Sequence, residues 1–188
     1  CSRRRKCGFF WMADYGFFSG FPIGVLHFAL SRRRAPTMTN NTFSQPAYSH
    51  SSLTHFVNTS NFDSHAIKHI FEGQVNRHGH AVGYHYEGIQ NTPGETLPSS
   101  EQILNVFGCY TAKVKVCGIN KTSNNGLSSF FPKDMHPHQV VDSINEAYNN
   151  CIKVPETVNT YQGITNNGLS ITLFINERSK IISAFPTT

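Results

Sequence analysis

The chain has 188 residues, of which 38% are hydrophobic and 14% are charged. This length allows one folded domain with an extension and excludes two large domains. The formal charge of +5 is compatible with a polyanionic partner such as RNA, although basic clusters before residue 35 supply part of the excess. Few charges and many Asn, Ser and Thr residues favour β-structure and turns over a helical bundle.

Residues 1–37 differ from the rest of the chain, because an apolar stretch at residues 8–30 lies between two basic clusters. One interpretation is a signal or membrane-associated segment. Asp14, Pro22 and His27 interrupt the stretch and count against that interpretation. Because Cys1 is not a natural start, the sequence is either a fragment or a reading frame extended upstream of Met12 or Met38, and we prefer the extended frame. We therefore treat residues 1–37 as separate from the fold. Residues 38–62 are polar and of low complexity, which predicts a flexible lead-in.

The folded domain is predicted over residues 63–188. Asp63 and Ser64 are the predicted N-cap of a short helix that runs from Ser64 to Glu72 and ends at Gly73. A turn at residues 76–79 then leads into an extended piece at 81–86. Residues 88–101 and 120–126 contain the residue types of surface loops.

Between and after these loops the pattern predicts strands and one longer helix. Alternation over residues 108–117 predicts a strand with one exposed face, and residues 128–132 form a compact element of hydroxyls and aromatics. The longest helix is predicted over residues 134–150. Three antiparallel strands follow at 161–165, 169–175 and 180–186. The expected fold class is α+β, with N-terminal short helices followed by antiparallel sheets and one longer helix.

Five of the ten histidines lie within residues 65–85: His65, His69, His78, His80 and His85. Histidine exchanges protons near neutral pH, so one interpretation is an acid/base pair. The other is a zinc site, in which His65 and His69, one helical turn apart, share an ion with His78, His80 or His85. No cysteine lies near these histidines and no HExxH pattern occurs, so the acid/base interpretation is preferred.

The order of the motifs over about residues 65–188 resembles the bacterial EndoU endoribonuclease domain. Each motif is weak by itself, and the resemblance depends on their order and spacing. The matching stretches are residues 69–76 (HIFEGQVN), 79–85 (GHAVGYH), 110–114 (YTAKV), 128–132 (SSFFP), 146–150 (EAYNN), 161–169 (YQGITNNGL) and 181–186 (IISAFP).

The resemblance implies an enzyme that cuts single-stranded RNA, usually at uridines, through attack of the substrate's own 2′-hydroxyl on the adjacent phosphorus. The product is a 2′,3′-cyclic phosphate. By the same resemblance His85 is the general base, His69 the general acid and Lys121 the cation near the phosphoryl oxygens. Other lysines near the matching position, namely Lys113, Lys115 and Lys133, remain alternatives to Lys121.

Three further residues are implied to bind substrate: Ser128, Ser183 and Phe185. Where the family typically has Thr-Ala-Tyr-Pro, this chain has Ser183-Ala184-Phe185-Pro186. Serine keeps the hydroxyl, and phenylalanine keeps a face for stacking a base or ribose but lacks the phenol oxygen. This difference from the family pattern affects the expected preference for uridine. It does not affect the proposed acid/base pair of histidines.

The resemblance also implies partners. The substrate is RNA, with tRNA among the candidates, and not DNA, because the nucleophile is the 2′-hydroxyl. No cofactor is required, although some relatives are stimulated by Mn²⁺. Such domains often end large secreted toxins that act in a cytoplasm and are blocked by an immunity protein. The alternatives are a non-catalytic RNA-binding module and a protein with a zinc-binding histidine site.

Overall fold

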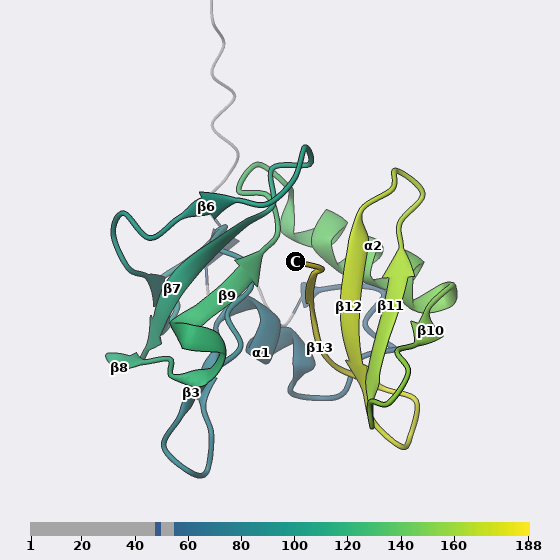
Figure 1. Ribbon diagram of the computed structural model, residues 1–188, viewed down its shortest axis with the longest axis horizontal. Coiled ribbons are helices and arrows are strands. Elements are labelled where there is room, and N and C mark those ends of the chain that lie inside the picture. Colours follow the sequence, from purple (N-terminus) through teal and green to yellow (C-terminus); the bar gives the residue numbers. More distant parts are fainter. Residues whose placement is uncertain (1–47, 50–54) are drawn as a thin grey trace, which may run out of the picture. The chain divides into compact units, whose positions relative to one another are not determined.

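The structure, a computed structural model, describes residues 48–49 and 55–188. Two larger antiparallel sheets and two α-helices form most of this part of the chain, and two two-stranded pairings of short strands add to them (Figure 1). These residues belong to one compact unit of the chain. The predicted α+β fold class is confirmed. The predicted segment 1–37, with its apolar stretch at 8–30, lies outside the described residues. Within the described residues, no helix has both the length and the apolar character needed to cross a membrane.

The first sheet is built around β7 (Tyr110–Val116), as the alternating pattern predicted. The short strands β5 (Gly94–Thr96), β6 (Gln102–Ile103), β8 (Ile119–Asn120) and β9 (Leu127–Phe130) all pair with it in antiparallel fashion. Ala112, Val114 and Val116 are buried, while Lys113 between them is exposed. The sheet therefore has one face in a hydrophobic cluster with Phe130 and Tyr84.

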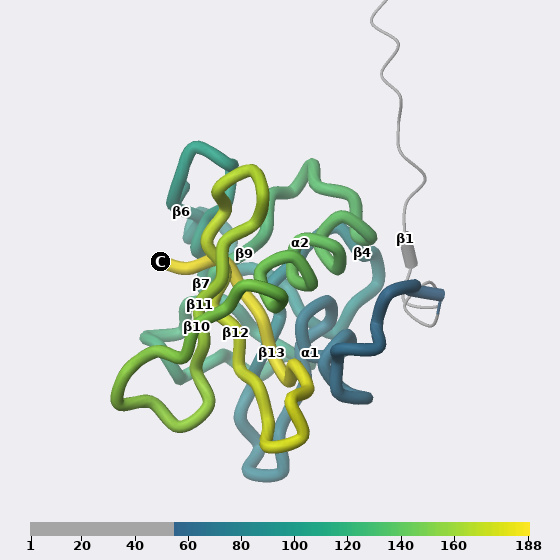
Figure 2. The backbone as a smooth tube through the Cα atoms, turned by 90° about the vertical axis from the view of Figure 1, so that its right-hand side faces the viewer, coloured from purple at the N-terminus to yellow at the C-terminus, as the bar shows by residue number. Residues whose placement is uncertain are grey.

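The second sheet is a meander of β10 (Ile152–Lys153), β11 (Thr160–Ile164), β12 (Ser170–Ile175) and β13 (Ile181–Pro186). Helix α2 (Pro137–Asn149) packs against it and buries Val140, Val141, Ile144 and Ala147 in the main core. Gly163 permits this close packing, because a Cβ there would lie 1.9 Å from the carbonyl oxygen of Ala147. Figure 2 shows α2 running beside this sheet.

Helix α1 (Ala66–Phe71) lies between the two sheets in Figure 1. The short hairpin of β2 (Gln74–Val75) and β3 (Ala81–Val82) follows it. The predicted end at Gly73 is confirmed, because Gly73 has a positive φ of 70°. The predicted N-cap is wrong. His65 is the N-cap residue and makes no side-chain cap, whereas the Asp63 carboxylate accepts a hydrogen bond from Asn176.

Some short elements were not predicted. Residues 88–101 contain β4 (Ile89–Gln90), which pairs with β1 (Tyr48–Ser49), as well as β5. Residues 120–126 contain the 3-10 helix η2 (Ser123–Gly126). Strands of two or three residues have no periodicity to detect, because they are defined by their pairing, here β4 with β1 and β5 with β7. Helix α2 begins at Pro137 and not at Asp134, since His136 caps it and extended backbone precedes a proline.

Residues 55–62, upstream of the predicted domain start, pack onto the domain. Phe62 is buried and forms a parallel bridge with Ile181. The Asn61 amide donates a hydrogen bond to Asn145 of α2 at 2.9 Å. This part of the predicted lead-in is therefore attached to the folded body, and the contacts are long-range ones that composition does not indicate.

Candidate active site

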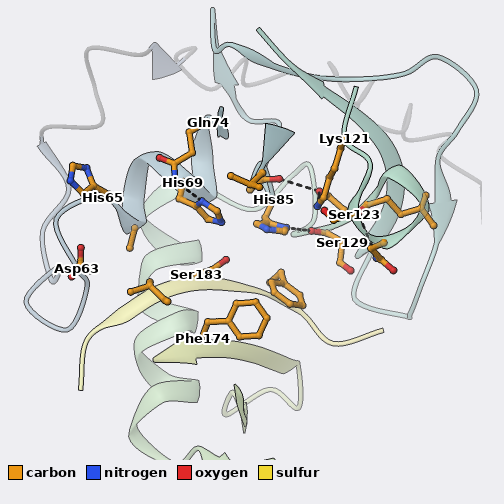
Figure 3. A pocket seen from close by; sticks show the side chains of 18 residues that line it. Asp63, His65, His69, Gln74, His85, Lys121, Ser123, Ser129, Phe174 and Ser183 are labelled. Carbon is orange, nitrogen blue, oxygen red and sulfur yellow. Dashed lines mark hydrogen bonds between the residues drawn. The ribbon is translucent and has the colours of Figure 1, made fainter. Parts of the chain in front are cut away.

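A pocket of about 620 Å³ opens between the two sheets and α1 (Figure 3). Its walls come from α1, the β2–β3 hairpin, the loop and strand at residues 121–129, and strands β12 and β13. All six predicted site residues line it: His69, His85, Lys121, Ser128, Ser183 and Phe185. Segments that are more than one hundred residues apart in sequence therefore meet at one site.

The two histidines are brought together by backbone contacts between α1 and the segment after β3. The N–H groups of Tyr84 and His85 donate to the carbonyls of His69 and Ile70, at 2.9 and 2.7 Å. These carbonyls lie at the end of α1 and need donor partners from outside the helix. Gly83 makes the approach possible, because its φ is +77° and a Cβ there would lie 2.2 Å from the His69 carbonyl oxygen.

His85 is buried and fixed in one orientation by β9. Its Nδ1 lies 2.9 Å from the carbonyl oxygen of Ser129, and its own carbonyl accepts from the N–H of Phe131. A carbonyl only accepts, so Nδ1 carries the proton and Nε2 of the neutral ring is a free base. Burial, and then the charge of Lys121, hold the pKa of His85 well below its usual value.

His69 has the opposite arrangement of its ring nitrogens. The amide nitrogen of Gln74 lies 3.2 Å from His69 Nδ1 and donates to it, so the neutral ring carries its proton on Nε2. Burial and the nearby Lys121 lower the pKa of His69 to about 4. The two imidazole centroids are 6.2 Å apart. The pair thus consists of one free base and one N–H donor.

Lys121 lies beside the pair, held by a hydroxyl relay. Its Nζ donates to Ser128 Oγ at 2.7 Å, and Ser128 Oγ donates to the Gly83 carbonyl at 3.1 Å. Burial lowers the pKa of Lys121 to about 8. The ammonium is therefore a positive charge in a partly desolvated position, where it interacts strongly with an anion.

The three other candidate lysines are not in the pocket lining. Lys115 pairs with Glu95 at 3.0 Å, and Lys133 pairs with Glu87 and Glu101 at 3.3 and 2.6 Å. Lys113 is exposed on the outer face of β7. Of the four lysines, Lys121 alone lines this pocket.

Aromatic rings from the second sheet form the opposite wall. The Phe185 ring is stacked on His85, with centroids 5.0 Å apart and an interplanar angle of 25°. The Phe174 ring meets Phe185 edge-on at 5.6 Å. Ser183, paired with Phe174 across the strands, is buried at the pocket wall, and its hydroxyl points into the space in Figure 3. The wall therefore offers a flat apolar surface beside one hydroxyl.

The zinc ligand set proposed from sequence is not assembled. Within the described residues, no three His, Cys, Asp or Glu side chains come together as a metal-binding group. His78 and His80 lie on the exposed turn of the β2–β3 hairpin, and His78 accepts a hydrogen bond from Arg77. His65 and His69 are on α1 at the pocket.

Three residues that shape the site were not predicted as site residues from the sequence: Gln74, Ser129 and Phe174. Gln74 follows His69 by five residues and was quoted as part of a motif, but its contact depends on how the hairpin folds back. Ser129 acts through its backbone carbonyl, which a side chain does not reveal. Phe174 looks like an ordinary strand residue until the register Phe174–Ser183 places it at the pocket.

A family model described as bacterial EndoU nuclease matches residues 63–188. The chain belongs to the bacterial EndoU nuclease family. A curated relative of this EndoU chain, described as "Toxin" and from Bacillus cereus, is 48% identical over 134 residues. These residues are 71% of this chain and 24% of the relative, so the EndoU chain spans about a quarter of the length of that protein. No solved structure matches it.

Proposed function

We propose that this EndoU nuclease is an endoribonuclease that uses the 2′-hydroxyl of RNA as its nucleophile. The observation that carries the proposal is the opposite hydrogen bonding of the two imidazoles. Ser129 leaves His85 Nε2 as a base, and Gln74 leaves His69 Nε2 with a proton. A transesterification needs one group of each kind, on either side of one phosphate.

In the proposed reaction His85 Nε2 takes the proton of the 2′-hydroxyl, and the oxygen attacks the adjacent phosphorus. A bond from phosphorus to O2′ forms while the bond to the 5′-oxygen of the next nucleotide breaks. His69, as the imidazolium that the bound phosphate favours, gives its Nε2 proton to that departing oxygen, while the Gln74 amide turns so that its oxygen accepts from Nδ1–H. Lys121 stabilises the negative charge that develops on the phosphoryl oxygens. The products are a 2′,3′-cyclic phosphate and a 5′-hydroxyl.

We assign uridine recognition to the wall of Ser183, Phe185 and Ser128. A flat uracil ring stacks on an aromatic face with ~1–3 kcal/mol per base. Ser128 Oγ donates to Gly83 and accepts from Lys121, so one lone pair remains to accept the N3–H of uracil. The Ser183 hydroxyl donates to or accepts from the edge of the same base.

The experiment that tests the proposed chemistry is incubation of the chain in EDTA with a short RNA containing one uridine. We expect a 2′,3′-cyclic phosphate at that uridine, detected by mass spectrometry, and no cleavage when the uridine carries a 2′-deoxy sugar. His85→Ala and His69→Ala should abolish the product. Binding without any cyclic phosphate, also after addition of Mn²⁺, would favour the non-catalytic RNA-binding alternative.

We also propose that the nuclease acts as a toxin domain. The support is the 48% identity to a Bacillus cereus protein described as a toxin, of which the matched part is 24%. An immunity protein would block the pocket, and tRNA is among the candidate targets. Induced expression in bacteria should stop growth, whereas His85→Ala should not. Normal growth with active enzyme and degraded RNA would contradict the toxin role.

A further inference from the structure

The segment from α1 through the β2–β3 hairpin exposes basic side chains but no carboxylate of its own. Among residues 64–86 the side chains of Lys68, Arg77, His65, His78 and His80 are exposed, and the one carboxylate, Glu72, is completely buried. The ion pairs of Lys115 with Glu95 and of Lys133 with Glu87 and Glu101 lie outside this segment. A surface of this kind attracts phosphate groups.

Hydrogen bonds within the hairpin hold its turn, residues 77–80, in shape. Asn76 Oδ1 accepts from the N–H groups of His78 and His80, at 2.9 and 3.0 Å, and the Asn76 carbonyl accepts from Gly79. The side chains of Arg77, His78 and His80 are all exposed. Arg77 Nε donates to His78 at 3.1 Å, and a guanidinium binds phosphate oxygens in pairs through its other nitrogens.

The stem of the hairpin connects this turn to the active site. Gln74 and Val82, which pair across β2 and β3, both line the pocket. The turn begins three residues further along, about 10 Å away at ~3.3 Å per residue. A stacked strand advances by about 3.4 Å per nucleotide along its axis, so the turn is within reach of phosphates about three nucleotides from the pocket. Figure 1 shows the hairpin projecting away from both sheets.

The hairpin lies on the His69 side of the pocket. Gln74 of β2 contacts His69, whereas His85 contacts Ser129 and Phe185 on the other side (Figure 3). In the proposed reaction His69 protonates the departing 5′-oxygen, and His85 serves the 2′-hydroxyl. The nucleotide on the His69 side is therefore the one that follows the cleaved bond.

We propose that the hairpin turn, with Arg77, His78 and His80, binds the phosphates of the RNA strand on the 3′ side of the cleaved bond. This inference rests on the proposed function, because the assignment of His69 as the acid sets the direction of the strand. The base-reading wall then selects the nucleotide on the 5′ side, while the turn binds the following strand without reading its sequence.

The test uses the whole chain and two RNAs that are blocked by 2′-O-methylation at the uridine, so that binding is measured without cleavage. One has uridine at its 5′ end followed by six adenosines, and the other has five adenosines, the uridine and one adenosine. The variants are Arg77→Ala/His78→Ala/His80→Ala and the single reversal Arg77→Glu. Lys153→Ala, which removes an exposed lysine on the outer strand β10, is the control for the loss of one positive charge elsewhere on the surface.

We expect both turn variants to bind the 3′-extended RNA about tenfold more weakly, with a shallower salt dependence of about 0.7 in slope per lost phosphate contact. Binding of the 5′-extended RNA should change less than twofold, and Lys153→Ala should match the wild type. Unmodified versions of both RNAs, cleaved in parallel, should show the same difference in kcat/KM.

Equal losses on both RNAs, a loss confined to the 5′-extended RNA, or no loss on the 3′-extended RNA would each overturn the inference. Failure of the proposed chemistry has a different signature: unmodified RNA would stay intact while the blocked RNAs bind. In that case a loss confined to the 3′-extended RNA would still support the binding role of the turn. Circular dichroism of each variant checks that the hairpin change leaves the fold intact.

Discussion

Gln74 donates its amide N–H to Nδ1 of His69 at 3.2 Å, and this contact sets which nitrogen of His69 faces the pocket with a proton. A glutamine amide can also turn end for end and accept from Nδ1–H with its oxygen. It can therefore support His69 in both the neutral and the protonated form, which an acid catalyst visits in turn. A neutral partner also leaves the pKa of His69 low, at about 4.

Replacing Gln74 by Glu should raise the pKa of His69. A carboxylate at this distance favours the imidazolium, and we expect a rise of about 1–2 units. The pH dependence of kcat/KM should move to higher pH by the same amount, and NMR titration of the His69 ring gives the pKa directly. Gln74→Met should lower activity without this shift. An unchanged pH profile in Gln74→Glu would contradict the positioning role.

The pH–rate profile should reflect the low pKa values of both histidines. The proposed reaction needs His69 protonated and His85 neutral. Burial lowers the pKa of His69 to about 4 and that of His85 well below its usual value. In the free enzyme protonated His69 is lost above this pH, so kcat/KM should fall about tenfold per pH unit.

The profile of kcat should be displaced from that of kcat/KM. The phosphate of the bound substrate carries a negative charge beside His69, which favours its protonated form. We therefore expect the fall in kcat at higher pH than the fall in kcat/KM, measured by steady-state kinetics on a uridine-containing RNA. Superimposed profiles would show that the substrate does not contact His69.

Stability should decline as the pH falls from 7 toward 4. An unfolded chain protonates His69 near the ordinary value of 6.5, whereas the folded chain protonates it only near about 4. Between these values the unfolded state binds more protons, so acid lowers the free energy of unfolding, by at most about 3 kcal/mol from this residue. Urea unfolding of wild type and His69→Asn measures the difference. The decrease in the free energy of unfolding per pH unit should be smaller in His69→Asn than in the wild type. In Ser183→Ala it should equal that of the wild type.

Lys121→Ala should lower kcat by about 10²–10³, the range for loss of one group that stabilises transition-state charge. Ser128→Ala should lower kcat less, by about tenfold, because it releases Lys121 from its 2.7 Å hydrogen bond without removing the charge. Lys113→Ala is the matched control and should retain full activity, since Lys113 is exposed and outside the pocket lining. A large loss of kcat in Lys113→Ala would contradict the assignment of Lys121 as the residue that stabilises the transition-state charge.

Phe185→Leu should weaken substrate binding and disturb His85. The substitution removes the ring stacked on His85 at 5.0 Å and the face offered to a base, so KM should rise about tenfold or more. Phe185→Tyr restores the hydroxyl typical of the family, and we expect it to sharpen the preference for uridine over cytidine. Competition between two RNAs that differ in this one base measures the preference. An unchanged preference would place base reading in Ser128 and Ser183.

Motif order and periodicity were enough to predict the α+β class, the family and most of the regular elements. Strand β7, helix α2 and the β11–β13 meander carry their own alternation or apolar stripe, so local sequence specifies them. His69 and His85 were likewise proposed from sequence, because both lie in dense, recognisable motifs, and the structure brings both to one pocket.

Only the tertiary structure decided what surrounds these residues. The protonated nitrogen of each histidine depends on Gln74 and on the Ser129 carbonyl, and the choice among four lysines depends on which one lines the pocket. His85 contacts two residues that are distant in sequence: the Ser129 carbonyl, 44 positions away, and the Phe185 ring. A sequence specifies local periodicity directly, but a hydrogen bond across such a distance exists only after both sheets have packed around α1.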